Sequence, residues 1–384
     1  MVLTPRRPKT HAQSHEKTSY RGMYSIEDRR RSKSGTIYFV HHKETKRRLV
    51  VKLLQKYKDA RYNLEALPER QLCQLEAIRW NRKFTPGVYI GLAPVTVDWY
   101  RNTLAVGDEL VEPATSDLNT NLEYALLMHV LPRERQLDLL ISELSPTQMP
   151  DQVPFLMNLV QRISEIHSDR SLSEQDNEYW GSLEQIRAKL KSNFAFVESV
   201  SGEPKGSTYL NSDIRRGFEA VKDTLSALIE QDRLQVCFAQ RVKEARIKRC
   251  HGDLKMQNIL ISSSQPDAAS DLSKNIGIID AIDFNLSLCH IDVLSDIAML
   301  AVDVQARCRS QVVAEWIVDY YLKLTGQQDA IARAVLRYYM LEKAFVGAAV
   351  SIIDDDDIAL GRNFLKVAQQ YIQEDSLAPS RGVR

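Results

Sequence analysis

One short stretch, CHGDLKMQNILI, limits more than any other what this chain can fold into. It runs from Cys250 to Ile261, and four polar side chains in its first part are followed by an apolar end. The apolar run from Ile259 to Ile261 is typical of a short buried strand. The polar residues before it are therefore predicted to lie on a loop that this strand fixes to the core.

A second apolar run, IGIID over residues 276–280, follows after the turn-rich segment SSQPDAASDLSKN. Two short apolar runs joined by such a segment predict a β-hairpin. Asp280 ends the second run, so we expect its side chain to emerge beside the polar loop. Asp283, three residues later, is the alternative for that position.

The remainder of the chain divides into a β-rich and a helical part. From residue 35 to 131 the pattern predicts strand, strand, helix, strand, strand, strand, with the helix over residues 66–84. Beyond Pro132 the predicted helices cover residues 135–144, 153–167, 182–200, 214–248 and most of 293–373. We therefore expect an α+β fold with a ligand-binding cleft between two lobes. The predicted units are a tail at 1–20, a small β-rich N-terminal lobe at 21–131, a larger, mostly helical C-terminal lobe at 132–373 and a tail at 374–384.

The composition is that of an ordinary globular protein. The 51 Lys and Arg residues balance 50 Asp and Glu residues, so no overall field favours nucleic acid or a membrane surface. The five cysteines are odd in number and never in C-x-x-C spacing, which argues against a disulfide framework and a zinc site. No apolar h-region follows the basic N-terminal segment, and no window of about 18 residues is apolar throughout. We expect a cytoplasmic protein with no membrane, nucleic-acid or obligate protein partner.

The polar loop contains the residue types that phosphoryl transfer from a nucleotide requires. That reaction needs a carboxylate at the attacking hydroxyl and oxygen ligands for Mg²⁺. Asp253 would supply the carboxylate, and Asn258 and Asp280 would supply the metal ligands. Each of these residues alone is more often a turn cap. Average residue usage gives the combined pattern H-[GR]-D-apolar-x-x-x-N-apolar in about one chain of this length in ten thousand, so the cluster carries the prediction.

The same residues resemble a known family. H-G-D-L-x-x-x-N-I, the I-D element on the returning strand and the later D-I-A are similar to the aminoglycoside phosphotransferase-like branch of the protein-kinase-like superfamily. K-R-C-H-G-D-L, I-I-D-A-I-D-F-N and I-D-V-L-S-D-I-A-M-L look like a bacterial group of that branch with unknown substrate. The resemblance covers roughly residues 30 to 373 and is most specific from Arg249 to Leu300. It implies a bilobal protein-kinase-like fold that uses ATP and Mg²⁺.

The resemblance also implies roles for individual residues. It makes Asp253 the catalytic aspartate, and Asn258 and Asp280 the two Mg²⁺ ligands. Lys52, in L-V-V-K, matches the lysine that binds the α and β phosphates, and Glu76 in the following helix would be its ion-pair partner. A solvent-facing strand lysine explains Lys52 equally well from the pattern alone, but its apolar neighbours favour a role, since a buried ammonium group needs a partner. A surface helix residue is the alternative for Glu76.

Supporting positions follow from the same resemblance. Asp296 would brace the catalytic loop through backbone N–H groups, with His251 as further structural support. A helix N-terminal acid, which the helix dipole favours, would place Asp296 at the same position. The adenine would hydrogen-bond backbone groups around Met128, His129 and Val130.

Two features depart from the family pattern. Lys255 stands two residues after Asp253, a spacing found in protein kinases, where it could neutralise charge on the transferred group. An exposed loop lysine is the equal alternative. The phosphate-covering loop has one glycine, Gly35, so its contacts would rest on Ser34, Thr36 and backbone N–H groups.

These residues predict an ATP- and Mg²⁺-dependent transfer of the γ-phosphoryl group to a hydroxyl of a small molecule, with Asp253 as the catalytic base. ATP against GTP and the identity of the acceptor stay open. The aspartates at 354–357 could receive a cation, but a loop that caps the next helix is the favoured explanation. One alternative is a catalytically silent ATP-binding regulator, although Asp253, Asn258 and Asp280 are all intact. The other is a Ser/Thr protein kinase, against which the missing A-P-E element and short activation segment argue.

Overall fold

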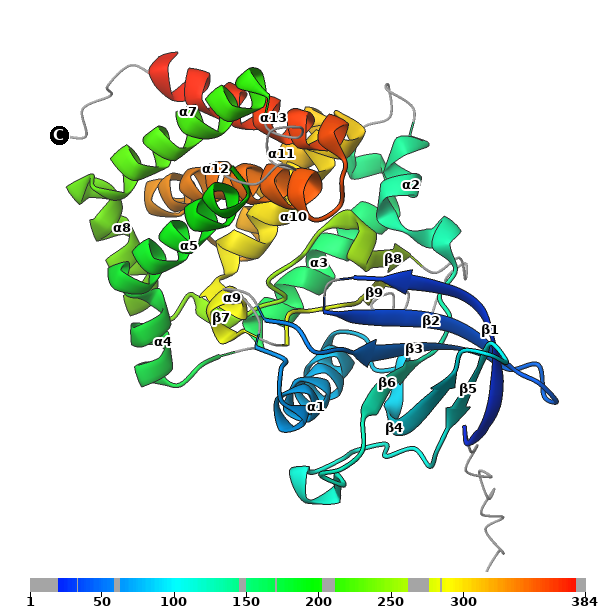
Figure 1. Cartoon of the computed structure of the whole chain (residues 1–384). Coiled ribbons are helices and arrows are strands. Elements are labelled where there is room, and N and C mark those ends of the chain that lie inside the picture. Colours follow the sequence, from blue (N-terminus) through cyan, green and yellow to red (C-terminus); the bar gives the residue numbers. More distant parts are fainter. Residues whose placement is uncertain are drawn as a thin grey trace, which may run out of the picture.

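The computed structural model describes residues 20–32, 34–58, 63–144, 150–169, 171–201, 211–261, 276–283 and 285–377. Within them a β-rich N-terminal part is followed by a helical C-terminal part, as Figure 1 shows in the change from blue and cyan to green, yellow and red. Residues 1–19 and 378–384, which make up most of the two predicted tails, lie outside the described residues. The last helix ends at Leu377.

Six strands of the N-terminal part close into an antiparallel barrel in the order β1-β2-β3-β6-β4-β5. Apolar side chains such as Val40, Val51 and Leu104 fill its interior. The first strand is missing from the sequence prediction, because Tyr24 and Ile26 are its only buried residues and its second half is charged. The strands are β1 Gly22–Arg31, β2 Gly35–His42, β3 Arg48–Leu54, β4 Tyr89–Asp98, β5 Thr103–Val106 and β6 Tyr124–Met128.

One long helix, α1 (Leu67–Phe84), packs on the outside of this barrel. Its apolar face places Leu75 and Ile78 against Leu92 of β4 and Leu126 of β6. This helix was predicted at nearly the same bounds, because its apolar residues recur at helical spacing and Pro86 follows its end. The packing fixes the inner face of α1 relative to β3.

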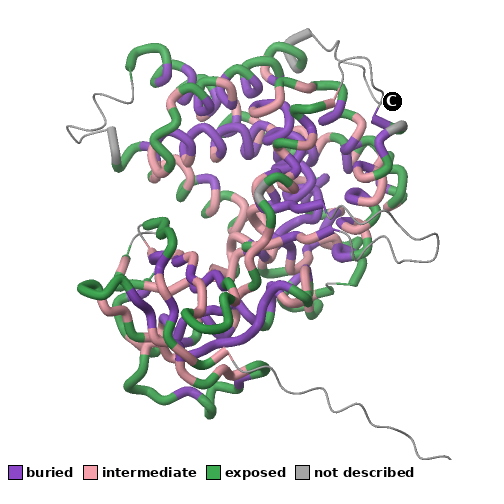
Figure 2. Tube along the Cα trace, turned by 90° about the vertical axis from the view of Figure 1, so that its right-hand side faces the viewer, coloured by how far each residue is buried: buried purple, intermediate pink, exposed green. Residues whose placement is uncertain are grey.

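The C-terminal part is a bundle around α10 (Val293–Cys308), which is buried at every position from Val293 to Ala306. Figure 2 shows this buried interior in purple, with exposed green segments around it. A helix that is enclosed on all sides needs mostly apolar residues all round, and its buried polar residues, such as Asp296, need partners. The other helices are α2 Leu137–Ser142, α3 Pro154–Ser168, α4 Glu174–Gly181, α5 Leu183–Ser201, α7 Ser212–Ile229, α8 Asp232–Lys243, α9 Leu286–Cys289, α11 Gln311–Leu324, α12 Ala330–Ile353 and α13 Ile358–Leu377.

Two predictions for the helical part need correction. The single helix predicted over residues 214–248 is instead α7, α8 and the strand β7 (Ile247–Arg249). The buried face of α7 ends at Ile229, and Ala245 takes a left-handed conformation (φ +52°) that ends α8. Helix α4 was not predicted, because its sequence is mostly polar; Ser173 caps it by accepting a hydrogen bond from the Asp176 N–H (3.0 Å).

Two small ribbons complete this part. The predicted hairpin is confirmed as β8 (Ile259–Ile261) paired with β9 (Ile276–Ile278), while β7 pairs with β10 (His290–Asp292). The intervening segment, 262–275, lies outside the described residues. All five cysteines are free, as expected. Among the described helices, none has the length and apolar character needed to cross a bilayer.

Candidate active site

The loop from Cys250 to Asn258 is held by a buried carboxylate of α10. Asp296 accepts hydrogen bonds from the backbone N–H groups of His251 (2.7 Å) and Gly252 (2.8 Å). His167 Nε2 lies 3.4 Å from the same carboxylate. Burial alone would raise the pKa of Asp296, but His167, His251 and the Gly252 N–H together hold it below its usual value. The ionised carboxylate therefore fixes the start of the loop from the core side.

Gly252 and His251 give this loop its shape. Gly252 has φ +85°, and a Cβ at this position would lie 2.6 Å from the Leu288 carbonyl oxygen, so only glycine fits without strain. His251 Nδ1 accepts the Asp253 N–H (3.2 Å), and Nε2 therefore carries the proton that is donated to the Ile279 carbonyl (2.9 Å). His251 thus connects the loop to the strand that ends at Asp280.

Asp253, Lys255 and Asn258 lie together in the second part of the loop, where Asn258 is buried and the other two are partly buried. The Asn258 amide nitrogen donates to the backbone oxygen of Asp253 (2.9 Å) and to its Oδ2 (3.3 Å). Lys255 Nζ lies 2.9 Å from the same Oδ2, and the Asp253 charge raises the pKa of Lys255 despite burial. Lys255 is therefore a paired cation rather than a free loop lysine.

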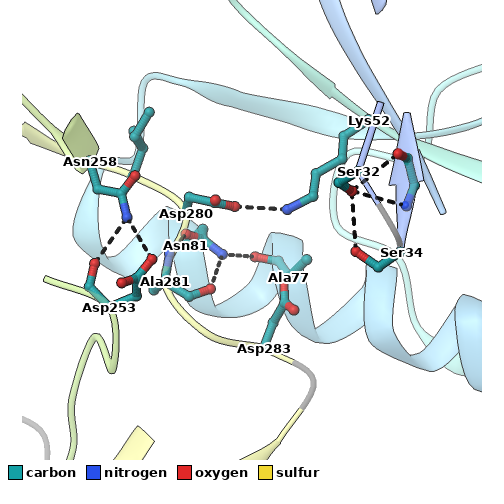
Figure 3. A network of polar contacts seen from close by, with 12 residues as sticks. Ser32, Ser34, Lys52, Ala77, Asn81, Asp253, Asn258, Asp280, Ala281 and Asp283 are labelled. Carbon is teal, nitrogen blue, oxygen red and sulfur yellow. Dashed lines mark hydrogen bonds and ion pairs between the residues drawn. The ribbon is translucent and has the colours of Figure 1, made fainter. Parts of the chain in front are cut away.

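Lys52 reaches this loop from the barrel. Its Nζ lies 2.7 Å from Asp280 Oδ1, an ion pair between residues 228 apart in the sequence (Figure 3). The Lys52 charge holds the pKa of Asp280 below its usual range. Asp280 has φ +61°, and its N–H donates to the Tyr89 hydroxyl (2.9 Å), which itself donates to Asn81 (3.1 Å). Side chains of α1 and β4 thus stabilise the unusual backbone conformation that points Asp280 at Lys52.

Asp283, the alternative to Asp280, has different contacts. The Cys73 thiol of α1 donates to Asp283 Oδ1 (3.6 Å), and burial raises the pKa of Asp283 to about 6 although Lys52 acts against it. Of the two aspartates, Asp280 forms the ion pair with Lys52. Sequence reasoning missed Cys73, Asn81 and Tyr89, because no local pattern indicates that they meet this loop.

The predicted pair of Lys52 with Glu76 is wrong in this structure. Glu76 Oε2 lies 3.2 Å from Arg249, and its Oε1 lies 3.5 Å from Arg79. The helical register of α1 turns Cys73 and Gln74 toward the Lys52 strand instead, and Gln74 donates to the Lys52 carbonyl (2.9 Å). Glu76 therefore links α1 to the helical part of the molecule and not to Lys52.

The turn between β1 and β2 is closed by its own side chains. Ser32 Oγ accepts the Gly35 N–H (3.2 Å) and lies 3.4 Å from the Ser34 hydroxyl. A Cβ at Gly35 would lie 2.5 Å from the Leu53 carbonyl oxygen, so close strand packing requires this glycine. Thr36 is buried in β2 and Ser34 is partly exposed at the turn.

Some backbone N–H and C=O groups in the segment after β6 form no hydrogen bond with the described residues. Met128 ends the strand opposite Val50 and Tyr89, and the His129 N–H donates to the Val88 carbonyl (2.9 Å). The His129 carbonyl and the Val130 N–H bond no other described residue. These two groups are a backbone acceptor and a backbone donor without a partner among the described residues.

Two groups of residues in this region offer possible metal ligands. In the described part of the chain, one group of three His, Cys and Asp ligand atoms converges: His167, Cys250 and Asp296, within 4.8 Å. The Asp296 oxygens already accept the loop N–H groups, which argues that this buried group is structural. By contrast, the Asn258 amide oxygen and Asp280 Oδ2 accept no hydrogen bond from the described residues. Carboxylate and amide oxygens are ligands that suit Mg²⁺.

The loop between α12 and α13 approaches the same site. Burial raises the pKa of Asp355, which also responds to the charges of Lys255 and Asp253. Asp357 caps α13 by accepting the Leu360 N–H (2.9 Å). The aspartate run therefore contains a helix cap and also lies near the polar loop.

Comparison of the sequence with protein-family models and with curated proteins gives no match. Among solved structures, an ethanolamine kinase from Plasmodium vivax is similar, with a TM-score of 0.50 and 12% identity over 92% of this chain and 83% of that one. The chain has a protein-kinase-like fold. An aminoglycoside phosphotransferase from Alicyclobacillus acidocaldarius gives a TM-score of 0.45 and 11% identity over 91% of this chain and 90% of that one. At these identities the likeness concerns the fold.

Proposed function

We propose that this protein transfers the γ-phosphoryl group of ATP to a hydroxyl group of a small molecule. The observation that carries the proposal is the Lys52–Asp280 ion pair beside Asp253 and Asn258 (Figure 3). Phosphoryl transfer depends on positioned charge more than on covalent chemistry by the protein. This group brings a cation, a candidate base and two oxygen ligands to one place.

Each charged side chain has a proposed role in this reaction. The Asp253 carboxylate orients the acceptor hydroxyl and accepts its proton, and Asn258 holds that carboxylate through its amide nitrogen. Lys255, which pairs with Asp253 at 2.9 Å, offers positive charge for the transferred group. Lys52 offers a second, fixed positive charge for the nonreacting phosphates.

Asn258 and Asp280 would hold Mg²⁺ through the oxygen atoms that make no other hydrogen bond. When bound, Mg²⁺ would neutralise negative charge on the phosphate oxygens. Asp280 would then share its carboxylate between Lys52 and the metal, which keeps the lysine close to the phosphates. Asp283, whose pKa is raised by burial, is the less suited of the two aspartates as an anionic ligand.

We place the nucleotide between a β-rich lobe, residues 21–131, and a helical lobe, residues 132–373. The adenine would bind the His129 carbonyl and the Val130 N–H, which are the unused groups after β6. The β1–β2 turn around Ser34 and Gly35 would cover the phosphates mainly through backbone N–H groups.

A small acceptor is favoured over a peptide. Between Asp280 and the start of α10 at Val293, the described residues form the one-turn helix α9 and the three-residue strand β10. That segment is too short to provide the platform on which protein kinases bind peptides. The similar ethanolamine kinase is, by its name, an enzyme acting on a small alcohol, and we propose the same broad acceptor class here.

Radiolabelled ATP tests the proposal directly. The purified protein would be incubated with γ-labelled ATP and Mg²⁺, with and without a small-molecule metabolite extract, and compared with Asp253→Asn. We expect label to enter an extract component, and the variant to lower this transfer by about a hundredfold to ten-thousandfold. ATP affinity, measured separately by calorimetry, should change little.

Asp223→Asn is the matched control, because Asp223 is exposed on α7, outside the candidate site. Equal transfer by wild type and Asp253→Asn would overturn the assigned mechanism. Binding of ATP without transfer to any component would favour the silent regulator. Label in protein rather than in small molecules would favour the protein kinase.

A further inference from the structure

An arginine of β1 lies on the same sheet face as Lys52. Strands β1, β2 and β3 are neighbours in the barrel (Figure 1). In their register, Arg30 of β1 is opposite Ile37 of β2, and Ile37 is opposite Lys52 of β3. Residues that are directly opposite in an antiparallel sheet point to the same face. Arg30 and Lys52 therefore belong to one row, on the face from which Lys52 reaches Asp280 (2.7 Å).

The barrel interior lies on the opposite face of these strands. Tyr38 and Val40 of β2 are buried in the interior. Ile37 and Phe39, which alternate with them along the strand, are only partly buried. The row that contains Arg30 is therefore on the outer face of the barrel, where a ligand can reach it.

The neighbouring row on this face leads to the segment after β6. Phe39 is opposite Val50, and Val50 is opposite Met128 at the end of β6. The adenine is proposed to bind just beyond Met128. The row of Arg30 and Lys52 lies two residues further along these strands, toward the β1–β2 turn, which is the side proposed for the phosphates.

The Arg30 guanidinium group packs on an aromatic ring but has no counter-charge. Its Cζ lies 5.0 Å from the centroid of the Phe39 ring. Arg30 is exposed, and its side chain forms no ion pair or hydrogen bond with any residue in the described ranges. A guanidinium group that packs on a ring keeps its in-plane N–H groups free, and these suit bidentate binding of a phosphate.

The β1–β2 turn has already used some of its own donors. The Ser32 N–H donates to the Gly35 carbonyl (2.8 Å), and the Gly35 N–H donates to Ser32 Oγ (3.2 Å). Two backbone N–H groups of this single-glycine turn are therefore bonded within the turn. A phosphate beneath it would gain from a further donor, which Arg30 at the end of β1 can supply.

We propose that Arg30 binds the phosphate groups of the nucleotide together with Lys52. This inference rests on the proposed function, which places a nucleotide on this face. Neighbouring strands lie about 4.8 Å apart, so the two residues face one ligand from backbone positions about 10 Å apart. Lys52 already pairs with Asp280, whereas the Arg30 charge has no carboxylate partner among the described residues.

Calorimetric titration with ATP and with adenosine, both in the presence of Mg²⁺, tests this assignment. Arg30→Met removes the guanidinium group and keeps an unbranched side chain beside Phe39. We expect this variant to bind ATP about tenfold to a hundredfold more weakly than wild type, the range for loss of a hydrogen bond to a charged group. Its affinity for adenosine, which lacks phosphate, should stay close to that of wild type.

Arg29→Met is the matched control. It removes the same charge one residue earlier, where the guanidinium group lies over Trp99 (5.3 Å) and the backbone is opposite Tyr38, on the other face. This variant should retain the ATP affinity of wild type within a few-fold, and thermal unfolding verifies that both variants fold.

Three results would overturn the role of Arg30 and leave the proposed function standing. They are unchanged ATP affinity in Arg30→Met, an equal loss in Arg29→Met, and an equal loss of adenosine affinity in Arg30→Met. If the wild type binds neither ATP nor adenosine, the proposed function is wrong as well. The two failures are therefore distinguishable.

Discussion

Two lysines of this molecule lie in charged, largely enclosed surroundings, and their pKa values move in opposite directions. Burial alone would lower the pKa of Lys52 in β3, but the charges of Asp280 and Asp283 outweigh it and raise the pKa. Lys189 in α5 lacks such a partner, and burial with the nearby Lys343 lowers its pKa to about 8. Lys52 therefore has carboxylates that neutralise its charge, which we call a compensated lysine. Lys189 has no such partner among the described residues, and we call it uncompensated.

The difference shows that partner geometry, and not burial, determines what a lysine in this fold can do. Lys52 is fixed at 2.7 Å from Asp280, so its charge is permanent and its position defined. That state suits a side chain that must meet phosphates at the same place in each turnover. Lys189 instead has no ion-pair partner among the described residues, so its charge is held at a cost in stability.

Replacing Lys52, the compensated lysine, should have the largest effect on activity. Lys52→Met deletes the cation and leaves the Asp280 carboxylate unpaired beside Asp283. We expect kcat/KM for ATP to fall by about a hundredfold or more, in the range known for loss of one charge-stabilising donor. Steady-state kinetics with any acceptor found by labelling would measure it.

Lys56→Met provides the control for that measurement, because Lys56 is an exposed lysine shortly after β3. It should retain the wild-type kcat/KM within a few-fold. If Lys52→Met is equally active, the Lys52–Asp280 pair is only structural, and the contrast between the two lysines loses its functional meaning.

Lys189, the uncompensated lysine, should make the free energy of unfolding depend on pH. The pKa of Lys189 is about 8 in the folded chain and about 10.5 when unfolded. Between these values the unfolded chain binds more protons, so the Lys189 contribution makes folding more favourable as pH rises. Lys189→Met lacks this contribution, and its stability advantage over wild type should shrink by on the order of 2 kcal/mol from pH 7 to pH 10.

Urea unfolding at a series of pH values would measure this difference, with Lys191→Met as the exposed control on the same helix. The groups facing Lys189 are Lys343, Glu342 and Asp296, and all three stay in both proteins, so their titration largely cancels. A constant difference between wild type and Lys189→Met across this range would show that Lys189 is not destabilised by burial.

The sequence predicted the parts of the site that are local. Asp253 and Asn258 are five residues apart on one loop, and the apolar runs of β8 and β9 are long enough to indicate the hairpin. The α+β order and the bounds of α1 followed from residue periodicity in the same way. Strand β1 and helix α4 did not, because charged and polar residues dominate them.

The long-range contacts could not be predicted from the sequence. Asp280 meets Lys52 across 228 residues, and the Tyr89 hydroxyl that supports its backbone comes from another strand. The apolar neighbours of Lys52 in LVVKLL indicate that it needs a partner, but they do not identify Asp280, and nothing in RAKLKS indicates that Lys189 lacks a counter-charge. Such pairing depends on how the barrel and the bundle pack.

The smallest effect on ATP affinity and stability is expected for a substitution of Glu76. This residue was predicted from the sequence to be the counter-charge of Lys52. Glu76 instead pairs with Arg249 at 3.2 Å, and its side chain is 39% exposed. Ion pairs between side chains this exposed contribute about 0–1 kcal/mol to the free energy of unfolding. Glu76→Gln should therefore leave ATP affinity within a few-fold of wild type and lower the free energy of unfolding by less than about 1 kcal/mol. Calorimetry and urea unfolding measure the two quantities.

A loss of ATP affinity as large as that of Lys52→Met would contradict this expectation. It would mean that α1 rotates on nucleotide binding and brings Glu76 to Lys52. Asp280 would then be the partner of Lys52 only in the free protein.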